Sequence, residues 1–143
     1  MLNKNIHFVV KEFLLTTSLI AINALAQNSQ AQQNCHVYFT NDSYILTHEA
    51  ILVLNDLVFN ISSSGPSLIT IVGHSDRTGR ATYNLKLSKR RAFAVDHFLK
   101  KSIKTANYRF QVSWQGEINP PFPTKDGVPE PYNRCVRVTL NKN

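Results

Sequence analysis

The residues best suited to bind a charged ligand lie in one stretch of the chain, residues 73–101, which reads GHSDRTGRATYNLKLSKRRAFAVDHFLKK. Its second half is typical of a helix with Ser88 as the N-cap, because apolar residues recur there at helical spacing. Lys89, Arg90 and Arg91 would then occupy the first turn. A helix N-terminus already carries a partial positive charge, so three cations at this position oppose the helix dipole.

A bound anion would turn this unfavourable arrangement into a favourable one. The first turn of a helix offers unpaired N–H groups, and the planar guanidinium of Arg91 matches the two oxygens of a carboxylate. We therefore interpret the helix start as a site for a carboxylate or a phosphate group. The alternative for Lys89 and Arg90 is that both side chains point into solvent.

Asp76 is the acidic residue that best complements this site. It follows a predicted strand that ends in Gly73-His74, and Gly79 comes shortly after it. A glycine-containing loop at a strand end is a common place for functional residues. If the loop folds over the helix start, Asp76 and Arg91 lie side by side. The two residues then form a structural salt bridge, or they face one ligand that carries both an ammonium and a carboxylate; the spacing does not choose between these roles.

The overall composition indicates one globular domain with a positive field. The chain has 143 residues, of which 43% are hydrophobic, and its formal net charge is +7. This is enough apolar material for a packed core. Residues 76–109 contain ten Lys or Arg residues against two acids, Asp76 and Asp96. Such a local excess favours an anionic polymer or surface as partner, and the alternative is a solvated face.

The N-terminal segment has the features of a secretory signal peptide. Lys4 and Lys11 precede the apolar run 13–22, and an Ala-Leu-Ala sequence follows it. This is the pattern of an export signal with its cleavage site, and the apolar run is too short to be a good membrane span. An uncleaved membrane anchor is the alternative. We expect a signal peptide at 1–26, a polar leader at 27–34 and one domain at 35–143, with no membrane span in the mature chain.

Two cysteines, Cys35 and Cys135, remain in the exported part. Disulfides persist in such compartments, and a bridge closing so long a loop is worth about 4–5 kcal/mol in the chain-entropy model. We predict a Cys35–Cys135 disulfide, which requires the first and last strands to be neighbours. Side-chain alternation argues against it, because Cys35 shares its strand face with Val37 whereas Cys135 shares its face with Arg137. Two free cysteines are the alternative.

The order of the predicted elements is βαβαββ. Thr47 is expected to cap the first helix, and residues 73–87 are expected to form a loop. This order predicts an α+β fold, a two-layer sandwich in which two long helices cover one face of a mixed four-stranded sheet. The predicted elements are a strand at 35–39, a helix at 48–60, a strand at 68–72, a helix at 88–101, a strand at 108–114, a proline-rich loop at 119–131 and a last strand at 135–140.

The spacing of reactive side chains disfavours other classes of function. The histidines after residue 26 are scattered, without the paired spacing of a metal site. No recognisable pair of carboxylates suggests a hydrolase. A nucleic-acid-binding module is disfavoured by the export signal and by the lack of interleaved aromatic residues in the basic segment. We therefore expect no enzyme activity, no catalytic residue, no metal, no cofactor and no nucleic-acid partner.

The motifs of residues 73–92 are similar to those of a known family. Gly73-His74-Ser75-Asp76-Arg77-Thr78-Gly79, then Tyr83-Asn84, then Leu87-Ser88-Lys89-Arg90-Arg91-Ala92 resemble the pattern G-[HY]-[ST]-D-x-x-G, N-x-x-L-S-x-x-R-A of OmpA-like peptidoglycan-binding domains. Residues 39–43 resemble the first strand and turn of that family, and residues 133–136 resemble its closing N-R-R-V. The resemblance covers about residues 35–140.

The resemblance implies a periplasmic module, associated with the Gram-negative outer membrane, that binds the peptide stem of peptidoglycan non-covalently. Asp76 would take the ammonium, and Arg91 the carboxylate, of the D-centre of meso-diaminopimelate. The same resemblance places Ser75, Thr78, Asn84 and Leu87 nearby. For Asn84 the alternative is that it only holds the loop.

Two positions depart from the family pattern. Thr40 stands where the family has an acidic residue or Asn, which puts one ligand contact in doubt. Cys135 replaces the second Arg of the closing motif, and the loop at 119–131 is particular to this chain. An alternative function is an interaction subunit of an envelope or secretion assembly in which wall binding is weak or lost. The loop at 119–131 is then the candidate surface for an envelope protein partner, through which the protein would associate with the outer membrane.

Overall fold

The fold is built on a mixed four-stranded sheet. The computed structural model of the chain describes residues 33–63, 67–104 and 108–142, so the predicted signal peptide and most of the polar leader lie outside the described residues. β2 runs parallel to β3 and antiparallel to β4, and β4 also pairs antiparallel with β1. The strands, in spatial order, are β1 (Gln33–Tyr38), β4 (Cys135–Lys142), β2 (Ser67–His74) and β3 (Tyr108–Gly116).

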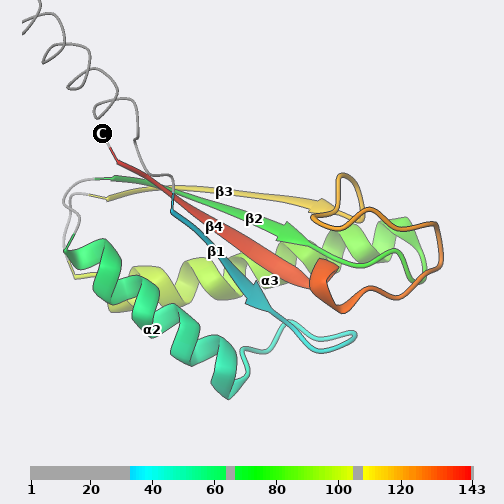
Figure 1. Cartoon of the computed structure of the whole chain (residues 1–143), viewed down its shortest axis with the longest axis horizontal. Helices are drawn as coiled ribbons and strands as arrows, with labels where there is room; N and C mark the ends of the chain where they lie inside the picture. The colour runs from blue at the N-terminus through cyan, green and yellow to red at the C-terminus, as the bar shows by residue number, and fades with distance from the viewer. Residues whose placement is uncertain (1–32, 64–66, 105–107, 143) are drawn as a thin grey trace, which may run out of the picture. The chain divides into compact units, whose positions relative to one another are not determined.

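Two helices cover one face of this sheet (Figure 1). α2 spans His48–Ser62 and α3 spans Ala81–Ser102, and a short 3-10 helix, η1, spans Pro131–Asn133. α3 packs on β2, β3 and β4, whereas α2 packs on β1 and on α3. The predicted βαβαββ order and the two-layer α+β sandwich are confirmed. Among the described residues, no helix has the length and apolar character needed to cross a membrane.

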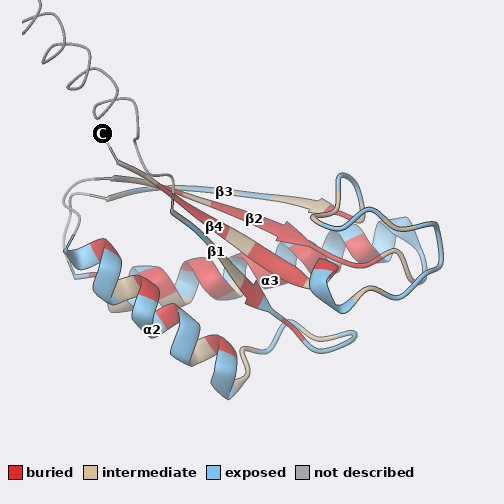
Figure 2. Cartoon of the chain, viewed as in Figure 1, coloured by how far each residue is buried: buried red, intermediate tan, exposed pale blue. Residues whose placement is uncertain are grey.

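The core lies between the sheet and the two helices, where Figure 2 shows the buried residues. β2 and β4 contribute apolar side chains at alternate positions, and Ile71 pairs with Val138 across the two strands. β2 is a central strand of the sheet, between β4 and β3. β3 lies at the sheet edge, so its alternating apolar residues are only half-buried. Each large buried side chain contributes about 1.5–3 kcal/mol. The helices contribute Leu54, Leu57, Ile61, Ala92, Val95 and Leu99.

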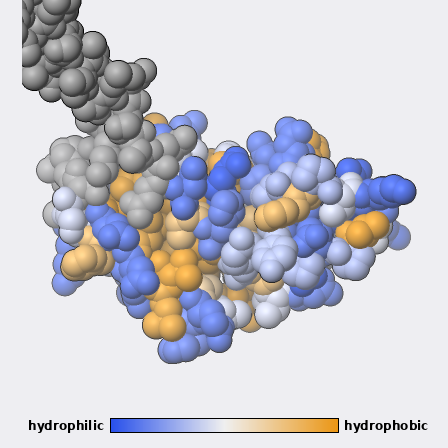
Figure 3. All heavy atoms as spheres, in the orientation of Figure 1, coloured by the Kyte–Doolittle hydropathy of each residue, from blue (hydrophilic) through white to orange (hydrophobic). Residues whose placement is uncertain are grey.

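α2 begins where the sequence predicts. The Thr47 hydroxyl accepts a hydrogen bond from the Ala50 amide at 3.2 Å and so caps the helix. The helix continues two residues past the predicted end, to Ser62. Its outer face leaves Leu52 and Phe59 exposed, and Figure 3 shows hydrophobic surface over this part of the molecule.

The start of α3 differs from the prediction. The helix begins at Ala81, with Arg80 at the N-cap in an extended conformation and without a side-chain capping bond. Ser88 lies inside the helix, where its hydroxyl donates to the Leu85 carbonyl and accepts from the Gly116 amide, both at 2.9 Å. Lys89, Arg90 and Arg91 are therefore not in the first turn. The predicted conflict between three cations and the helix dipole is wrong.

The buried face of the first turns of α3 explains this error. Buried positions there fall at Asn84, Leu87, Ser88 and Arg91, which is helical spacing. Three of these four residues are polar, so a search for apolar periodicity does not find them. The run of buried apolar residues begins only with Ala92, Val95 and Leu99.

The predicted disulfide is also wrong, because both cysteines are free. Cys35 lies opposite Val138 and Cys135 lies opposite Tyr38 in the β1–β4 pair. Residues opposite each other share a sheet face, and residues three apart on a strand do not, so the two thiols lie on opposite faces. The strands are neighbours as required, but side-chain alternation keeps the sulfurs apart. Burial raises the pKa of Cys135 to about 12.

Candidate functional site

A pocket of about 350 Å³ lies between the turn after β1, the loop after β2 and the first turns of α3. It brings together Asp76 and Arg91, which the sequence predicts to share a ligand. Thr78, Asn84 and Leu87 also line it, so five of the six predicted ligand residues meet there. The remaining lining residues are Asn41, Asp42, Gly79 and Tyr83.

Arg91 is fully buried at this pocket. Its Nε donates to the carbonyl of Ser43 at 2.7 Å, Nη1 to that of His74 at 3.1 Å and Nη2 to that of Thr40 at 3.2 Å. The guanidinium also lies 5.3 Å from the centre of the Phe39 ring. None of the ion pairs found among the described residues includes Arg91. The cation is therefore held by neutral groups, which is a costly way to bury a charge.

The charge state of Arg91 follows from its surroundings. Burial lowers the pKa of Arg91 to about 10, and the nearby Asp76 carboxylate partly opposes this shift. The guanidinium remains charged at neutral pH. Because each terminal nitrogen carries two hydrogens and uses one for a carbonyl, one N–H on Nη1 and one on Nη2 have no acceptor among the described residues. A carboxylate placed there would receive two charge-assisted hydrogen bonds.

Asp76 is 4% exposed, and its carboxylate already has two partners. The Thr78 hydroxyl donates to Oδ1 at 2.8 Å. Nη1 of Arg134 lies 3.3 Å from Oδ2, and this is the salt bridge of the site. A direct Asp76–Arg91 salt bridge is therefore not the arrangement found. The sequence indicates Arg134 only as part of the closing motif, because a pair separated by 58 residues leaves no local spacing signal.

Asn84 holds the loop to the helix. Its side-chain Nδ2 donates to the Thr78 carbonyl at 2.9 Å and to Oε2 of Glu117 at 2.7 Å. Both hydrogens of this amide nitrogen are thereby used. The loop-holding role, one of the two roles left open by the sequence, accounts for these contacts.

Ser75 is not part of the pocket lining. The residue is fully buried, and its amide donates to the Gly116 carbonyl at 2.8 Å. Its hydroxyl has no hydrogen-bond partner among the described residues. The structure thus separates Ser75 from the other five predicted residues.

Asp42 and Tyr83 are site residues that the ligand prediction missed. Asp42 adopts a positive φ of 53° in the turn after β1, a conformation that Asn and Asp tolerate better than most residues. The Tyr83 hydroxyl donates to Oδ1 of Asp42. The sequence signal was the turn-forming Asn41-Asp42-Ser43, which predicts the turn but not its place beside α3. The pocket therefore presents the carboxylates of Asp42 and Asp76 together with the guanidinium of Arg91.

Gly73 sets the distance between β2 and α3. A Cβ atom at this position would lie 2.1 Å from the Ser88 carbonyl oxygen and 3.1 Å from the Ala92 Cβ. Only glycine permits this approach, which carries the loop after β2 over the first turns of α3. Gly73, Ser88 and Ala92, all part of the predicted motif, therefore set how closely β2 packs on α3.

His74 is buried beside this site. Its two ring nitrogens have no hydrogen-bond partner within the described ranges. Burial and the nearby Arg137 lower the pKa of His74 to about 4, so the imidazole is neutral at pH 7. No cluster of three or more metal-ligating side chains occurs in the part of the chain that the structure describes.

Residues 38–134 match the sequence profile of the OmpA family, which is more than half of the chain. The chain belongs to the OmpA family. Outer membrane protein 41 of Porphyromonas gingivalis is 34% identical over 102 residues, which cover 71% of this chain and 25% of that protein. The peptidoglycan-associated lipoprotein of Pasteurella multocida is 31% identical over 94 residues, which cover 66% of this chain and 61% of that protein. The chain thus spans less than two thirds of either relative.

Solved structures show the same fold. The peptidoglycan-associated lipoprotein from Burkholderia pseudomallei superposes with a TM-score of 0.62 at 28% identity, covering 74% of this chain and 89% of that one. The C-terminal domain of Helicobacter pylori MotB gives a TM-score of 0.64 at 20% identity, and the match covers 76% of this chain and 85% of that domain. OmpA-like domains are known for association with peptidoglycan, and their role is structural rather than catalytic.

Proposed function

We propose that the protein binds the peptide stem of peptidoglycan non-covalently in the periplasm, through the D-centre of meso-diaminopimelate. It would thereby anchor itself, or an attached envelope complex, to the cell wall. The observation that carries the proposal is the pocket in which Asp42 and Asp76 lie near Arg91. A ligand centre that bears both an ammonium and a carboxylate complements these two signs of charge.

The burial of Arg91 favours an anionic partner. A buried guanidinium without a direct ion pair has lost most of its hydration, so a ligand carboxylate compensates part of that loss. The remaining N–H groups on Nη1 and Nη2 suit a two-oxygen acceptor. The ammonium of the same ligand centre would lie toward Asp76 and Asp42. The names of the two peptidoglycan-associated relatives support the same class of ligand.

Co-sedimentation with purified sacculi tests this proposal. The protein is compared with Asp76→Asn and Asp42→Asn, which remove one pocket carboxylate each and keep side-chain size. Asp56→Asn removes a carboxylate from the exposed face of α2 and is the matched control. We expect at least about a tenfold loss of affinity for Asp76→Asn, equivalent to about 1.4 kcal/mol, a smaller loss for Asp42→Asn, and none for Asp56→Asn. Wild-type binding by a folded Asp76→Asn variant at about 300 mM salt, where attraction between surface charges is screened, would contradict the proposal.

One observation favours the second candidate, an interaction subunit with weak wall binding. Asp76 already pairs with Arg134, so a ligand ammonium must share or displace that partner. If the wild-type protein does not pellet with sacculi, this candidate is favoured. The loop at 119–131 is then the surface to test, because Phe122 and Val128 are exposed there. A photo-crosslinker at Phe122 should capture an envelope protein that the same probe at Asp56 does not.

The domain boundaries belong to the same proposal. Residues 1–26 would direct export and be removed, leaving the polar leader at 27–34 and the domain at 35–143. The intact mass of the protein recovered from the periplasm tests this point. A mass that includes residues 1–26 would favour the uncleaved anchor instead.

A further inference from the structure

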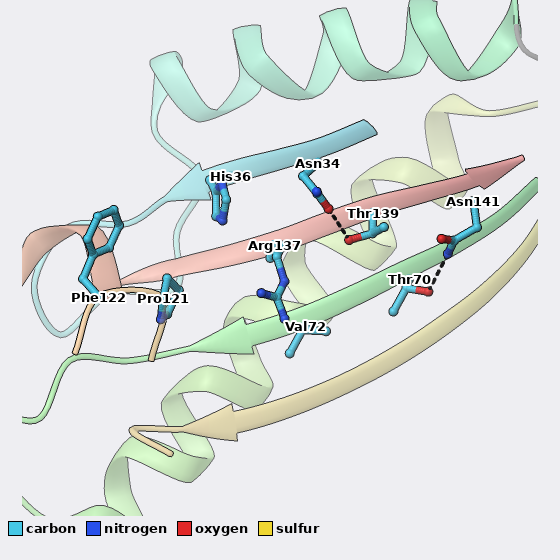
Figure 4. Close-up of a pocket in the computed structure, with 9 residues that line it drawn as sticks. All are labelled: Asn34, His36, Thr70, Val72, Pro121, Phe122, Arg137, Thr139 and Asn141. Atoms are coloured by element: carbon cyan, nitrogen blue, oxygen red, sulfur yellow. Dashed lines mark hydrogen bonds between the residues drawn. The ribbon is translucent and has the colours of Figure 1, made fainter. Parts of the chain in front are cut away.

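The face of the sheet that the helices leave uncovered carries a hollow of about 610 Å³. Its floor is formed by β1, β4 and β2, and one end is closed by the loop after β3 (Figure 4). This hollow is separate from the pocket at Asp76, with which it shares no lining residue. The lining residues are Asn34, His36, Thr70, Val72, Pro121, Phe122, Arg137, Thr139 and Asn141.

The strand register places neutral hydrogen-bonding groups side by side in this hollow. Thr139 lies between Asn34 on β1 and Thr70 on β2. The Thr139 hydroxyl donates to Oδ1 of Asn34 at 2.8 Å, and Nδ2 of Asn141 donates to the Thr70 hydroxyl at 3.3 Å. These bonds fix the side chains and leave other donors and acceptors on the same groups. The floor is therefore a pre-arranged set of amides and hydroxyls.

Arg137 supplies the charge of the hollow. It lies between His36 and Val72 in the register, and Figure 4 shows it among the other lining side chains. Within the described ranges of the chain, no acidic residue lines the hollow. Arg137 has no hydrogen bond or ion pair to any residue that the structure describes, although it is only partly exposed. An unpaired guanidinium above a neutral polar floor selects for an anionic group.

The loop wall of the hollow is fixed in place. The side-chain amide of Asn133 accepts from the Phe122 amide at 2.8 Å and donates to the Phe122 carbonyl at 2.7 Å. The Phe122 ring packs against Tyr132 at 5.3 Å, and Tyr132 packs edge-on against Tyr38 at 5.7 Å. Phe122 nevertheless keeps much of its ring exposed. A fixed, half-exposed aromatic ring at the rim offers an apolar surface to a ligand.

We propose that this hollow binds an acidic saccharide. The carboxylate of one sugar would pair with Arg137, its hydroxyl and N-acyl groups would bond to Thr139, Thr70 and Asn34, and the C–H face of a neighbouring sugar would lie against Phe122. A single cation among neutral hydrogen-bonding groups suits one carboxylate on a hydroxyl-rich ring. It does not suit a nucleic acid, which needs several cations along its phosphates. This site does not depend on the peptide-stem pocket, and its ligand is of a different chemical class.

NMR titration with monosaccharides tests the proposal. N-acetylmuramic acid and N-acetylglucosamine share one ring, but only the first carries a carboxylate. We expect N-acetylmuramic acid to shift the backbone amide signals of Arg137 and Thr139 and the side-chain amide signals of Asn34, and N-acetylglucosamine to bind at least about fivefold more weakly. Arg137→Gln should reduce the affinity for the acidic sugar to that of the neutral one. Arg109→Gln removes a positive charge from the edge strand outside the hollow and should leave binding unchanged.

A second pair of probes, glucuronic acid and glucose, identifies the source of the ligand. Binding of both acidic sugars supports a site for acidic polysaccharides in general, and binding of N-acetylmuramic acid alone supports a cell-wall sugar. The proposal is overturned if neither acidic sugar shifts the NMR signals of the residues that line the hollow, or if the shifted signals belong to the pocket at Asp76. It is also overturned if a folded Arg137→Gln variant binds the acidic sugar like the wild type. Asp76→Asn should leave sugar binding unchanged, so failure of the peptide-stem proposal is distinguishable from failure of this one.

Discussion

At the scale of single residues, Arg91 joins the fold to the site. Its three bonds to backbone carbonyls connect the turn after β1 to the end of β2, while its remaining N–H groups are available to a ligand. The sequence indicates Arg91 through its forked guanidinium, the family motif and an expected helix start; the structure places Arg91 in the pocket lining but not at the helix start. Arg134 and Asp42 were missed as site residues because their partners are distant in the sequence, and only tertiary contacts reveal them.

The dual role of Arg91 has a consequence for stability. Arg91→Met removes the cation and leaves three carbonyls without their donor, so we expect a loss of about 3–5 kcal/mol in the free energy of unfolding. Arg90→Met, at the exposed neighbouring position, should cost less than about 0.5 kcal/mol. Urea denaturation measures both. A loss below about 1 kcal/mol for Arg91→Met would show that these hydrogen bonds contribute little. It also follows that Arg91 variants are poor reporters of ligand binding, and that Asp76 is the better position to test.

His74 makes stability depend on pH. Its pKa is about 4 in the folded protein and about 6.5 in an unfolded chain. The unfolded chain therefore binds more protons between these values, so the stabilising contribution is complete above about pH 6.5 and is lost as the pH falls toward 4. We expect a decrease of about 2 kcal/mol in the free energy of unfolding between pH 7.5 and 5 from this residue.

The measurement compares wild type with His74→Leu at both pH values. His36 and Arg137 also face this imidazole, and since both remain in the variant, their own effects cancel in the difference. The variant should show a decrease smaller than wild type by about 2 kcal/mol. Equal decreases in the two proteins would show that His74 does not carry this pH dependence.

At the scale of elements, the sequence predicts best what is local and apolar. Thr47 and the apolar residues at helical spacing after it, among them Leu54 and Leu57, predicted α2 because the cap and the periodicity agree. The start of α3 was predicted seven residues too late, because the first turns of the helix bury the polar residues Asn84, Ser88 and Arg91. The disulfide failed although β1 and β4 are neighbours, because Cys35 and Cys135 face opposite sides of the sheet, as the alternation of apolar residues in the sequence already argued.

The proline-rich loop is the element whose order depends most visibly on one side chain. Asn133 bonds both the amide and the carbonyl of Phe122. Asn133→Ala removes both bonds, and we expect a loss of about 1–3 kcal/mol together with faster hydrogen exchange at the Phe122 amide. Asn55→Ala, on the exposed face of α2, is the control and should change neither quantity by much. Unchanged protection at Phe122 would show that other contacts of the loop hold it.

At the scale of the whole molecule, the positive charge gathers on the outer face of α3. Asp96 is the only acid of this helix, and it is buried against Lys100 at 2.9 Å. Lys89 lies 4.6 Å from the centre of the Trp114 ring, and Arg90 lies 5.4 Å from that of Tyr44. The exposed basic residues of α3 are Lys86, Lys89, Arg90, His97, Lys100 and Lys101.

This basic face should add a salt-sensitive component to wall binding that is distinct from the pocket. A cell wall rich in carboxylates attracts the face over roughly one Debye length, about 14 Å at 50 mM salt and about 6 Å at 300 mM. We expect the double variant Lys89→Gln/Arg90→Gln to pellet several-fold less with sacculi at about 50 mM salt. The difference from wild type should shrink at about 300 mM salt, because the pocket bonds are short-ranged and screened less.

The double variant Arg109→Gln/Lys125→Gln has the same net charge but keeps the α3 face, so it separates local from overall charge. If both double variants lose the same amount of sacculus binding, the loss is caused by the lower net charge, and the basic face of α3 has no role of its own. If Lys89→Gln/Arg90→Gln loses binding equally at both salt concentrations, these residues make direct contacts rather than steering the protein. If Asp76→Asn pellets like wild type at low salt but is released at high salt, charge alone holds the first contact and the pocket provides the specific one.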